Sequence, residues 1–251
     1  MAATIKSGLL IWNFKSGKHR TSQKHESINV YGIDYSPDGK TIAAGGQGRT
    51  LRLWDVATGK QLKSMKVADT IAELSYAPDG KTIAVAVFPP GIIFYEPATG
   101  KQTPIRLIKH SVRSLDFSHD GKTLAVSGGG VVTLVNLDTD ELIGRMEGQL
   151  TATFGPIDGQ LAALAGPNIF RLDPKLASVT ETIQFSFPAA GTHDLTYTPD
   201  GRHLVTANGN GTVYVLRLKK WTASGNPDKV ERTEIEKRAR ERARAGKTFG
   251  R

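Results

Sequence analysis

Ser36-Pro37-Asp38-Gly39 is the first of five related turns that recur along this chain of 251 residues. The other four are Ala77-Pro78-Asp79-Gly80, Ser118-His119-Asp120-Gly121, Pro156-Ile157-Asp158-Gly159 and Thr198-Pro199-Asp200-Gly201, and their glycines lie 41, 41, 38 and 42 residues apart. Pro presets the φ angle of a turn, Asp hydrogen-bonds the nearby backbone, and Gly takes the left-handed conformation. A period of about 40 residues with several short strands per unit indicates the blades of a β-propeller.

The segments around each turn support this interpretation. Apolar and polar residues alternate before the turn, as in residues 33–35 and 115–117, which is typical of half-buried strands. Small apolar runs follow the turn, as in residues 41–46 and 123–128. Because small side chains suit a crowded position, we expect these second strands to lie near the central channel. A third strand follows, for example residues 51–55.

The third strand of one repeat ends in Trp54-Asp55, and a second turn, Asp55-Val56-Ala57-Thr58-Gly59-Lys60, follows it. Related turns begin at Asn13 and Glu96. This combination resembles the WD-repeat family over residues 1–218, and the similarity between repeats resembles its bacterial-type members. The resemblance implies docking platforms for proteins, and sometimes for peptides, nucleic acids or chromatin, without chemistry of their own. The Trp-Asp pair is intact only once, and it is replaced by Trp12-Asn13, Tyr95-Glu96, Val135-Asn136 and Leu172-Asp173.

Six repeats can be recognised, so the expected fold is an all-β propeller over residues 1–218 with a short C-terminal helix beyond it. The first repeat lacks its opening strand, since residues 1–4 align with the second strand of later repeats, and the last repeat lacks its closing strand. We expect the chain to be an N-terminally truncated part of a seven- or eight-bladed propeller. The alternative is a six-bladed ring with two three-stranded blades. Unpaired blade edges would permit self-association.

The net charge of +9 is unevenly distributed. Residues 219–251 contain eleven Lys or Arg against five Asp or Glu, a net charge of +6, which leaves +3 for the propeller. The absence of cysteine excludes disulfides and thiolate sites, and we found no signal-peptide or membrane-spanning pattern. We therefore expect a cytoplasmic protein.

The tail at residues 219–251 is predicted to be helix-prone or disordered, with a helix that starts near Pro227 and stops at Gly246. Its late basic residues are candidate contacts for an anionic partner such as nucleic acid. These are Arg238, Arg240, Arg242, Arg244 and Lys247. The alternative is a solvated helix that aids solubility or links to another domain.

The remaining polar residues include candidates for catalytic and cofactor sites. A metal site could be suggested by His110, Asp116, His119 and Asp120. However, Asp116 is expected to point outward from its strand, and His119 and Asp120 belong to a turn. The glycine-rich residues 45–48 and 128–130 lie between expected strands and are interpreted as bends, not phosphate loops.

His193-Asp194 near Thr192 could suggest an acid–base pair with a hydroxyl, but neighbours in a strand face opposite ways. The expected channel positions are mostly Ala, Gly and Val. We therefore expect no metal, no cofactor and no catalysis.

Three functions remain open, and the first is a non-catalytic scaffold that binds a protein partner. The second is a nucleic-acid-associated adaptor anchored by the tail. The third is a propeller enzyme of the lactonase or quinone-dependent dehydrogenase kind, which needs ligands that converge on the channel from several blades.

Overall fold

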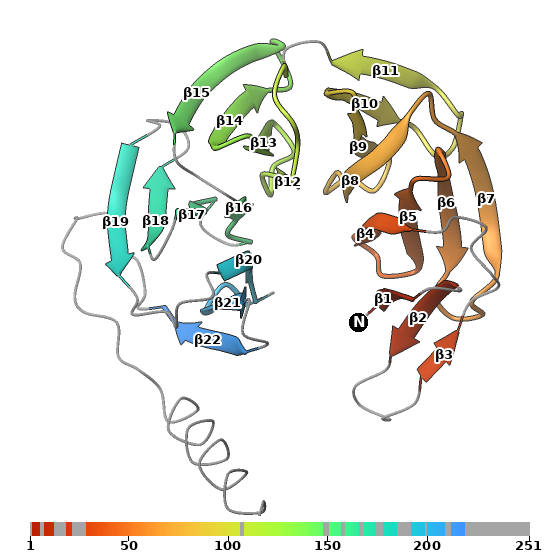
Figure 1. Cartoon of the computed structure of the whole chain (residues 1–251), viewed down its shortest axis with the longest axis horizontal. Helices are drawn as coiled ribbons and strands as arrows, with labels where there is room; N and C mark the ends of the chain where they lie inside the picture. The colour runs from red at the N-terminus through yellow and green to blue at the C-terminus, as the bar shows by residue number, and fades with distance from the viewer. Residues whose placement is uncertain are drawn as a thin grey trace, which may run out of the picture.

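A computed structural model gives the arrangement of most of the propeller region. The residues that the structure describes are 2–5, 8–12, 19–21, 29–105, 108–147, 151–156, 159–165, 168–173, 178–184, 192–198, 200–208 and 212–218. They form six antiparallel sheets, here called blades 1 to 6 in chain order, which are arranged around a common centre (Figure 1). The prediction of an all-β propeller is confirmed, whereas the tail and its expected helix lie outside the described residues.

Each blade consists of strands that are consecutive in the chain. Blade 1 contains β1 (Ala2–Ile5), β2 (Gly8–Trp12) and β3 (His19–Thr21). Blade 2 contains β4 (Val30–Tyr35), β5 (Thr41–Gly46), β6 (Thr50–Asp55) and β7 (Gln61–Lys66). Blade 3 contains β8 (Thr70–Tyr76), β9 (Ile83–Phe88), β10 (Gly91–Tyr95) and β11 (Gln102–Ile105).

The second half of the propeller follows the same order. Blade 4 contains β12 (Ser114–Phe117), β13 (Thr123–Gly128), β14 (Val131–Asn136) and β15 (Glu141–Glu147). Blade 5 contains β16 (Thr151–Phe154), β17 (Leu161–Ala165), β18 (Asn168–Asp173) and β19 (Ser178–Gln184). Blade 6 contains β20 (Thr192–Tyr197), β21 (His203–Asn208) and β22 (Val213–Arg217).

The strand before each recurring turn is the innermost strand of its blade. Figure 1 shows β4, β8, β12, β16 and β20 nearest the centre, with β7, β11, β15 and β19 on the outside. Neighbouring inner strands contact each other in chain order, from β4 with β8 to β16 with β20. The expectation that the small second strands lie near the channel is therefore wrong.

The small residues of the second strands are buried between blades instead. Ala43, Ala84 and Ala125 have at most 1% of their surface exposed. Strand β5 packs against β8 of the next blade, and β13 packs against β16 in the same way. Small side chains are needed there because two sheets meet face to face at close-packed density.

Large side chains complete these contacts between blades. The fully buried Leu51 of blade 2, for example, belongs to one apolar cluster with Ile71 and Tyr95 of blade 3. The inner strands come close as well, since a Cβ atom on Gly32 would lie 2.8 Å from the backbone nitrogen of Leu74. Glycine is therefore required on β4 by the backbone of β8.

The recurring turns have the predicted geometry. The glycines at their ends have φ angles between 63° and 71° and are Gly39, Gly80, Gly121, Gly159 and Gly201. In the first turn, Asp38 accepts hydrogen bonds from the Ser36 hydroxyl at 2.7 Å and from the Lys40 backbone N–H at 3.0 Å. Asp120 accepts the matching bonds from Ser118 and Lys122. Turn chemistry therefore accounts for Asp120, as predicted.

Candidate functional site

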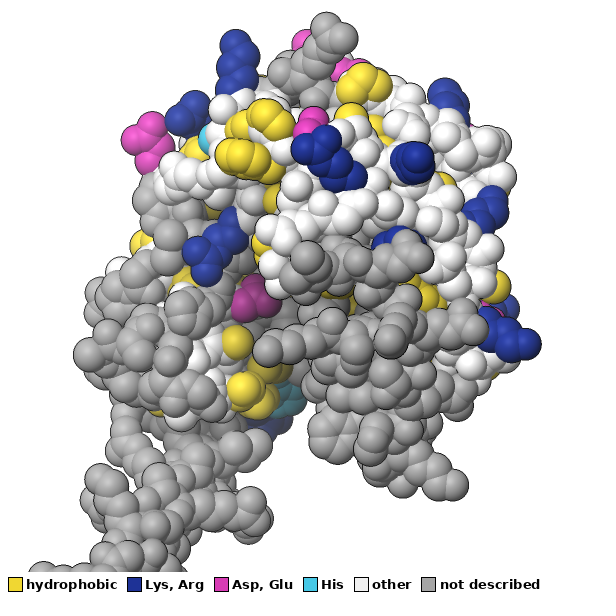
Figure 2. Space-filling view, turned by 45° about the vertical axis from the view of Figure 1, so that its right-hand side comes forward, with side chains coloured by type: hydrophobic (Ala, Val, Ile, Leu, Met, Phe, Trp, Pro, Cys, Tyr) yellow, Lys and Arg dark blue, Asp and Glu magenta, His cyan; other side chains and the backbone are white. Residues whose placement is uncertain are grey.

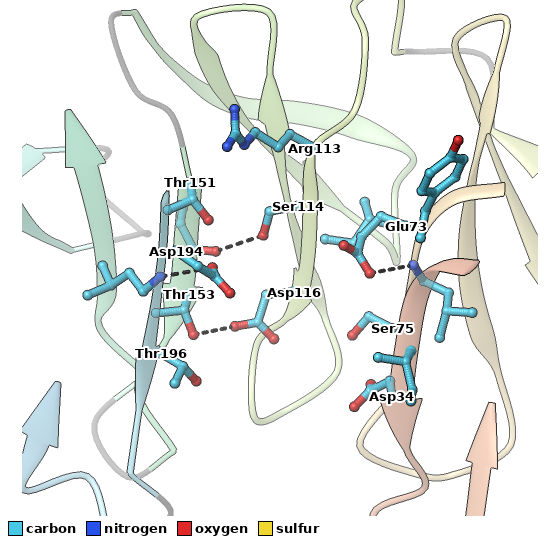
Figure 3. A pocket seen from close by; sticks show the side chains of 16 residues that line it. Asp34, Glu73, Ser75, Arg113, Ser114, Asp116, Thr151, Thr153, Asp194 and Thr196 are labelled. Atoms are coloured by element: carbon cyan, nitrogen blue, oxygen red, sulfur yellow. Dashed lines mark hydrogen bonds between the residues drawn. The ribbon is translucent and has the colours of Figure 1, made fainter. Parts of the chain in front are cut away.

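The inner strands surround a central pocket with a volume of about 530 Å³. Five strands from five blades line it, namely β4, β8, β12, β16 and β20 (Figure 3). Because alternate residues of a strand face the same side, each strand presents its polar residues to the pocket at every second position. The pocket is therefore polar although the blades around it are apolar inside.

Two layers of side chains can be distinguished along the pocket. The layer nearer the recurring turns, here called the turn-proximal layer, consists of Asp34, Ser75, Asp116, Thr153 and Thr196. The second layer, here called the turn-distal layer, lies two residues earlier on each strand. It consists of Glu73, Ser114, Thr151 and Asp194, and Gly32 occupies the matching position of β4. Four carboxyl groups from blades 2, 3, 4 and 6 therefore face one space.

β-Bulges set the start of the turn-distal layer in three blades. The register shifts between Val30 and Gly32, between Ile71 and Glu73, and between Thr192 and Asp194. A bulge bends the strand and redirects the side chains beside it. Tyr31 is the bulge residue of β4, and Arg113 immediately precedes Ser114 at the matching position of blade 4. Both side chains line the pocket.

Asp34 and Asp116 fasten neighbouring blades together. The Asp34 carboxylate accepts the backbone N–H of Tyr76 on blade 3 at 2.8 Å. The Asp116 carboxylate accepts the backbone N–H of Phe154 on blade 5 at 2.7 Å and the Thr153 hydroxyl at 2.9 Å. The expectation that Asp116 points outward is wrong, because its strand is the innermost one and its polar face meets the channel and the next blade.

Burial dominates the protonation of these two groups. The loss of solvent raises the pKa of Asp34 to about 6 and that of Asp116 to about 7, although the backbone hydrogen bonds favour the ionised form. The nearby Asp34 charge raises the pKa of Asp116 further. Both carboxyl groups therefore titrate near neutral pH.

Glu73 and Asp194 occupy the turn-distal layer and make only local hydrogen bonds. Each accepts the N–H of the residue after it, with Leu74 N at 2.9 Å from Glu73 and Leu195 N at 2.8 Å from Asp194. Burial raises the pKa of Glu73 to about 8, and the charges of Asp194 and Asp34 add to this effect. Glu73 therefore carries a proton for much of the time at neutral pH.

Thr151 contributes a buried hydroxyl to the same layer. Its side chain is 1% exposed and lines the pocket, and its hydroxyl has no hydrogen-bond partner. In Figure 3 the hydroxyl points into the space between the strands. Buried hydroxyl groups nearly always have a partner. The wall of the channel therefore contains a buried hydroxyl that has no hydrogen-bond partner among the described residues.

The other polar residues considered from the sequence do not assemble into a site. His110 Nε2 lies 3.2 Å from the Thr133 hydroxyl, and His119 is exposed in its turn. No group of three or more His, Cys, Asp or Glu among the described residues is arranged to hold a metal ion. The Thr192 hydroxyl donates to Asn208 at 2.9 Å, so Asn208 holds it in place. Residues 45–46 end β5 and residue 128 ends β13, while residues 47–48 and 129–130 form the bends that lead to β6 and β14.

The basic tail residues proposed to contact an anionic partner lie outside the described residues. Of the four channel carboxyl groups, Asp116 and Asp194 were considered from sequence and dismissed, and Asp34 and Glu73 were not considered. The reason is that the wrong strand was taken to line the channel. Their signal was present, since Asp34 and Asp116 both lie two positions before the first residue of a recurring turn.

Comparisons with known proteins agree with this architecture. The family model described as WD domain, G-beta repeat matches residues 17–55 and 102–135. The chain is 35% identical over 79 residues to small ribosomal subunit protein RACK1y of Oryza sativa subsp. japonica, covering 30% of this chain and 24% of that protein. It is 37% identical over 51 residues to periodic tryptophan protein 2 homolog of Dictyostelium discoideum, covering 20% of this chain and 6% of that protein. The chain is a β-propeller that contains WD repeats.

Solved structures show the same fold at low sequence identity. The β-propeller domain of Cps50 (Swd1) from Myceliophteria thermophila superposes with a TM-score of 0.73 at 16% identity, covering 92% of this chain and 80% of that one. Hydrazine synthase of Kuenenia stuttgartiensis superposes with a TM-score of 0.70 at 16% identity, covering 84% of this chain and 70% of that one. This WD-repeat chain therefore shares a fold with proteins of different function, and it spans a quarter or less of the curated relatives that it matches.

The surface adds two observations. On the face shown in Figure 2 the molecule is hollowed near its centre, an acidic side chain lies in the hollow, and Lys and Arg side chains are dispersed around it. No helix in the described part of the chain is long and apolar enough to cross a membrane.

Proposed function

We propose that this WD-repeat propeller is a non-catalytic scaffold that binds a protein partner at the mouth of its central channel. The observation that carries the proposal is the composition of the pocket rim. Tyr31 lines the pocket yet has 49% of its surface exposed, and the exposed Arg113 lines the same pocket. Tyr and Arg are the residue types, with Trp, that contribute most to binding at protein interfaces.

The rigidity of the channel supports the same function. The hydrogen bonds from Tyr76 to Asp34 and from Phe154 to Asp116 join separate blades around the pocket. A site held by packed strands loses little conformational freedom when a partner binds. The two most restrained carboxyl groups thus have a structural reason for their burial, which supports binding at this pocket over acid–base chemistry.

A second candidate function is that of a nucleic-acid-associated adaptor. It is favoured by the charge of +6 in residues 219–251, which include Arg238, Arg240, Arg242, Arg244 and Lys247. The carboxyl groups of the channel would repel phosphate, so this function would depend on the tail. It requires salt-sensitive binding that is lost when residues 226–251 are deleted, and binding that survives the deletion would contradict it.

Site-specific photo-crosslinking tests the scaffold function. A photoreactive residue is placed at Tyr31 in the full chain, and a matched variant carries it at Leu142, which is 52% exposed on the outer strand β15. We expect a discrete protein to crosslink to position 31 and Arg113→Ala to weaken the product. Crosslinking at position 142 alone, or equal products at both positions, would contradict binding at the channel mouth.

A further inference from the structure

The four carboxyl groups of the channel come from separate blades and lie alongside an unpartnered buried hydroxyl. Asp34, Glu73, Asp116 and Asp194 all line the pocket together with Thr151. Arg113 is the one cation among the lining residues, and in Figure 3 its guanidinium points away from the carboxyl groups, toward one end of the pocket. Among the described residues, the interior of the pocket therefore has acceptors from several directions and no positive group between them.

The distribution of the acceptors over separate blades bears on the kind of cation that fits them. A metal ion needs ligands that converge on one point, and no such group occurs in the described residues. An ammonium group is likewise a compact point charge, whereas a guanidinium is a planar cation with five N–H donors that diverge in a fixed fork. Acceptors dispersed over several blades match diverging donors better than they match a point charge.

We propose that the channel receives the guanidinium group of an arginine side chain from a protein partner, held by Glu73 and Asp194 in the turn-distal layer. This inference rests on the proposed scaffold function, because the arginine is presented by the docked protein. The volume of about 530 Å³ is within the range of about 300–1,000 Å³ that is usual for ligand pockets. Rotation of the buried Thr151 side chain, whose hydroxyl has no partner among the described residues, would offer the guanidinium a further acceptor.

Binding of a cation here is coupled to release of protons. At neutral pH the channel retains protons, because burial raises the pKa of Glu73 to about 8 and that of Asp116 to about 7. The charged groups that face Glu73 across the channel are Asp34 on β4, Asp116 on β12 and Asp194 on β20, with Arg113 at the rim. The guanidinium favours the ionised carboxylates, so affinity rises as the pH rises through these pKa values.

Calorimetric titration of the full chain with a capped Gly-Arg-Gly peptide tests the inference. The control peptide carries citrulline, which has nearly the shape of arginine without its charge. We expect the arginine peptide to bind about tenfold more tightly near pH 8.5 than near pH 6, with protons released in buffers of different ionisation enthalpy. Equal binding of the citrulline peptide, absence of binding, or an affinity that does not depend on pH would overturn the proposal.

Protein variants separate a local effect from a general effect of charge. Near pH 8.5, where Glu73 is mostly ionised, Glu73→Gln and Asp194→Asn should each weaken binding of the arginine peptide about tenfold, because each removes a charge-assisted hydrogen bond. Asp120→Asn removes the same charge from a turn outside the pocket and should leave the affinity unchanged. A loss of affinity in Asp120→Asn equal to that in Glu73→Gln would overturn the proposal.

The crosslinking experiment distinguishes the two proposals. A partner that crosslinks at position 31 equally well in the wild type and in Glu73→Gln would leave the scaffold function standing and contradict the guanidinium assignment. Binding of the arginine peptide without any crosslink at position 31 would contradict the proposed docking site, and it would also contradict the assignment of the arginine to a docked protein.

Discussion

Asp34 and Asp38 are four residues apart on the same blade, and so are Asp116 and Asp120, yet the two members of each pair behave in opposite ways. The turn residues Asp38 and Asp120 have a lowered pKa, chiefly because the hydroxyl groups of Ser36 and Ser118 donate to them. The channel residues Asp34 and Asp116 have a raised pKa because they are buried. All four accept hydrogen bonds, so access to water makes the difference.

The range of the hydrogen bonds differs as well. Asp38 and Asp120 bond to groups two residues away in the chain. Asp34 and Asp116 bond to backbone N–H groups 42 and 38 residues away, on the next blade. A turn aspartate therefore stabilises one hairpin, while a channel aspartate stabilises the association of two blades.

Loss of a channel aspartate should have the largest effect on stability. Asp116→Ala leaves the Phe154 N–H without its acceptor between blades 4 and 5. We expect a loss of about 2 kcal/mol in the free energy of unfolding, or about 4–8 °C in Tm for a domain of this size. Thermal unfolding at neutral pH measures it.

Asp116→Asn is the matched control, because its amide oxygen can still accept from Phe154. We expect it to retain most of the stability of the wild type. If the asparagine variant were as unstable as the alanine variant, the charge of Asp116 and not its role as an acceptor would join the blades.

Glu73→Gln should change stability in a pH-dependent way. Glu73 has a pKa of about 8 in the fold and 4.5 as a free group, so the folded state favours its protonated form. The wild type therefore loses stability as the pH rises from 4.5 to 8, and the glutamine variant escapes this loss. We expect the variant to be more stable by about 1 kcal/mol near pH 9, or about 2–4 °C in Tm, and equal to the wild type near pH 4. A gain of equal size at both pH values would indicate an effect of packing.

The same contrast explains how much of the fold could be predicted from sequence. Local interactions leave a pattern, so the Asp-Gly turns, their period and the propeller fold could be predicted. The order of strands from the centre outward could not, because the buried alanines of β5 and β13 suit a channel wall and a contact between blades equally well. This one ambiguity placed Asp116 on the wrong side of its strand.

The candidate site was harder to predict than the fold. Glu73 and Asp194 are equivalent in their repeats, but the other repeats have Gly32, Ser114 and Thr151 at that position. The repeats share no motif at this position, and only the arrangement of the blades around a common centre brings the carboxyl groups together (Figure 1). The bulges that aim them depend on pairing between strands, which composition does not reveal.

Asp120→Asn tests the role of the turn aspartates and should lower the free energy of unfolding less than Asp116→Ala does. The lowered pKa of Asp120 means that its ionised form stabilises the fold above the ordinary value of 3.8, and that this contribution is lost as the pH falls below it. We expect a loss of about 0.5 kcal/mol in the free energy of unfolding at neutral pH, because the turn is open to solvent, and the solvent screens the charge. Chemical denaturation near pH 7 and near pH 3 measures the difference, which should disappear in acid. A loss that persists in acid would assign the effect to hydrogen-bond geometry.

The ion pair between Lys122 and Asp138 should contribute least. The two charged atoms are 3.7 Å apart and both side chains are well exposed. Ordering two long side chains in water offsets most of the attraction, so Lys122→Ala should lower the free energy of unfolding by only about 0.3 kcal/mol. Because the backbone N–H that Lys122 donates to Asp120 remains in this variant, the turn itself is preserved. Unfolding at low and high salt is the measurement, and the small loss should vanish at high salt. A larger loss that salt does not remove would mean that the lysine stem packs on the blade, and that side chains at the turns carry more of the stability than their exposure suggests.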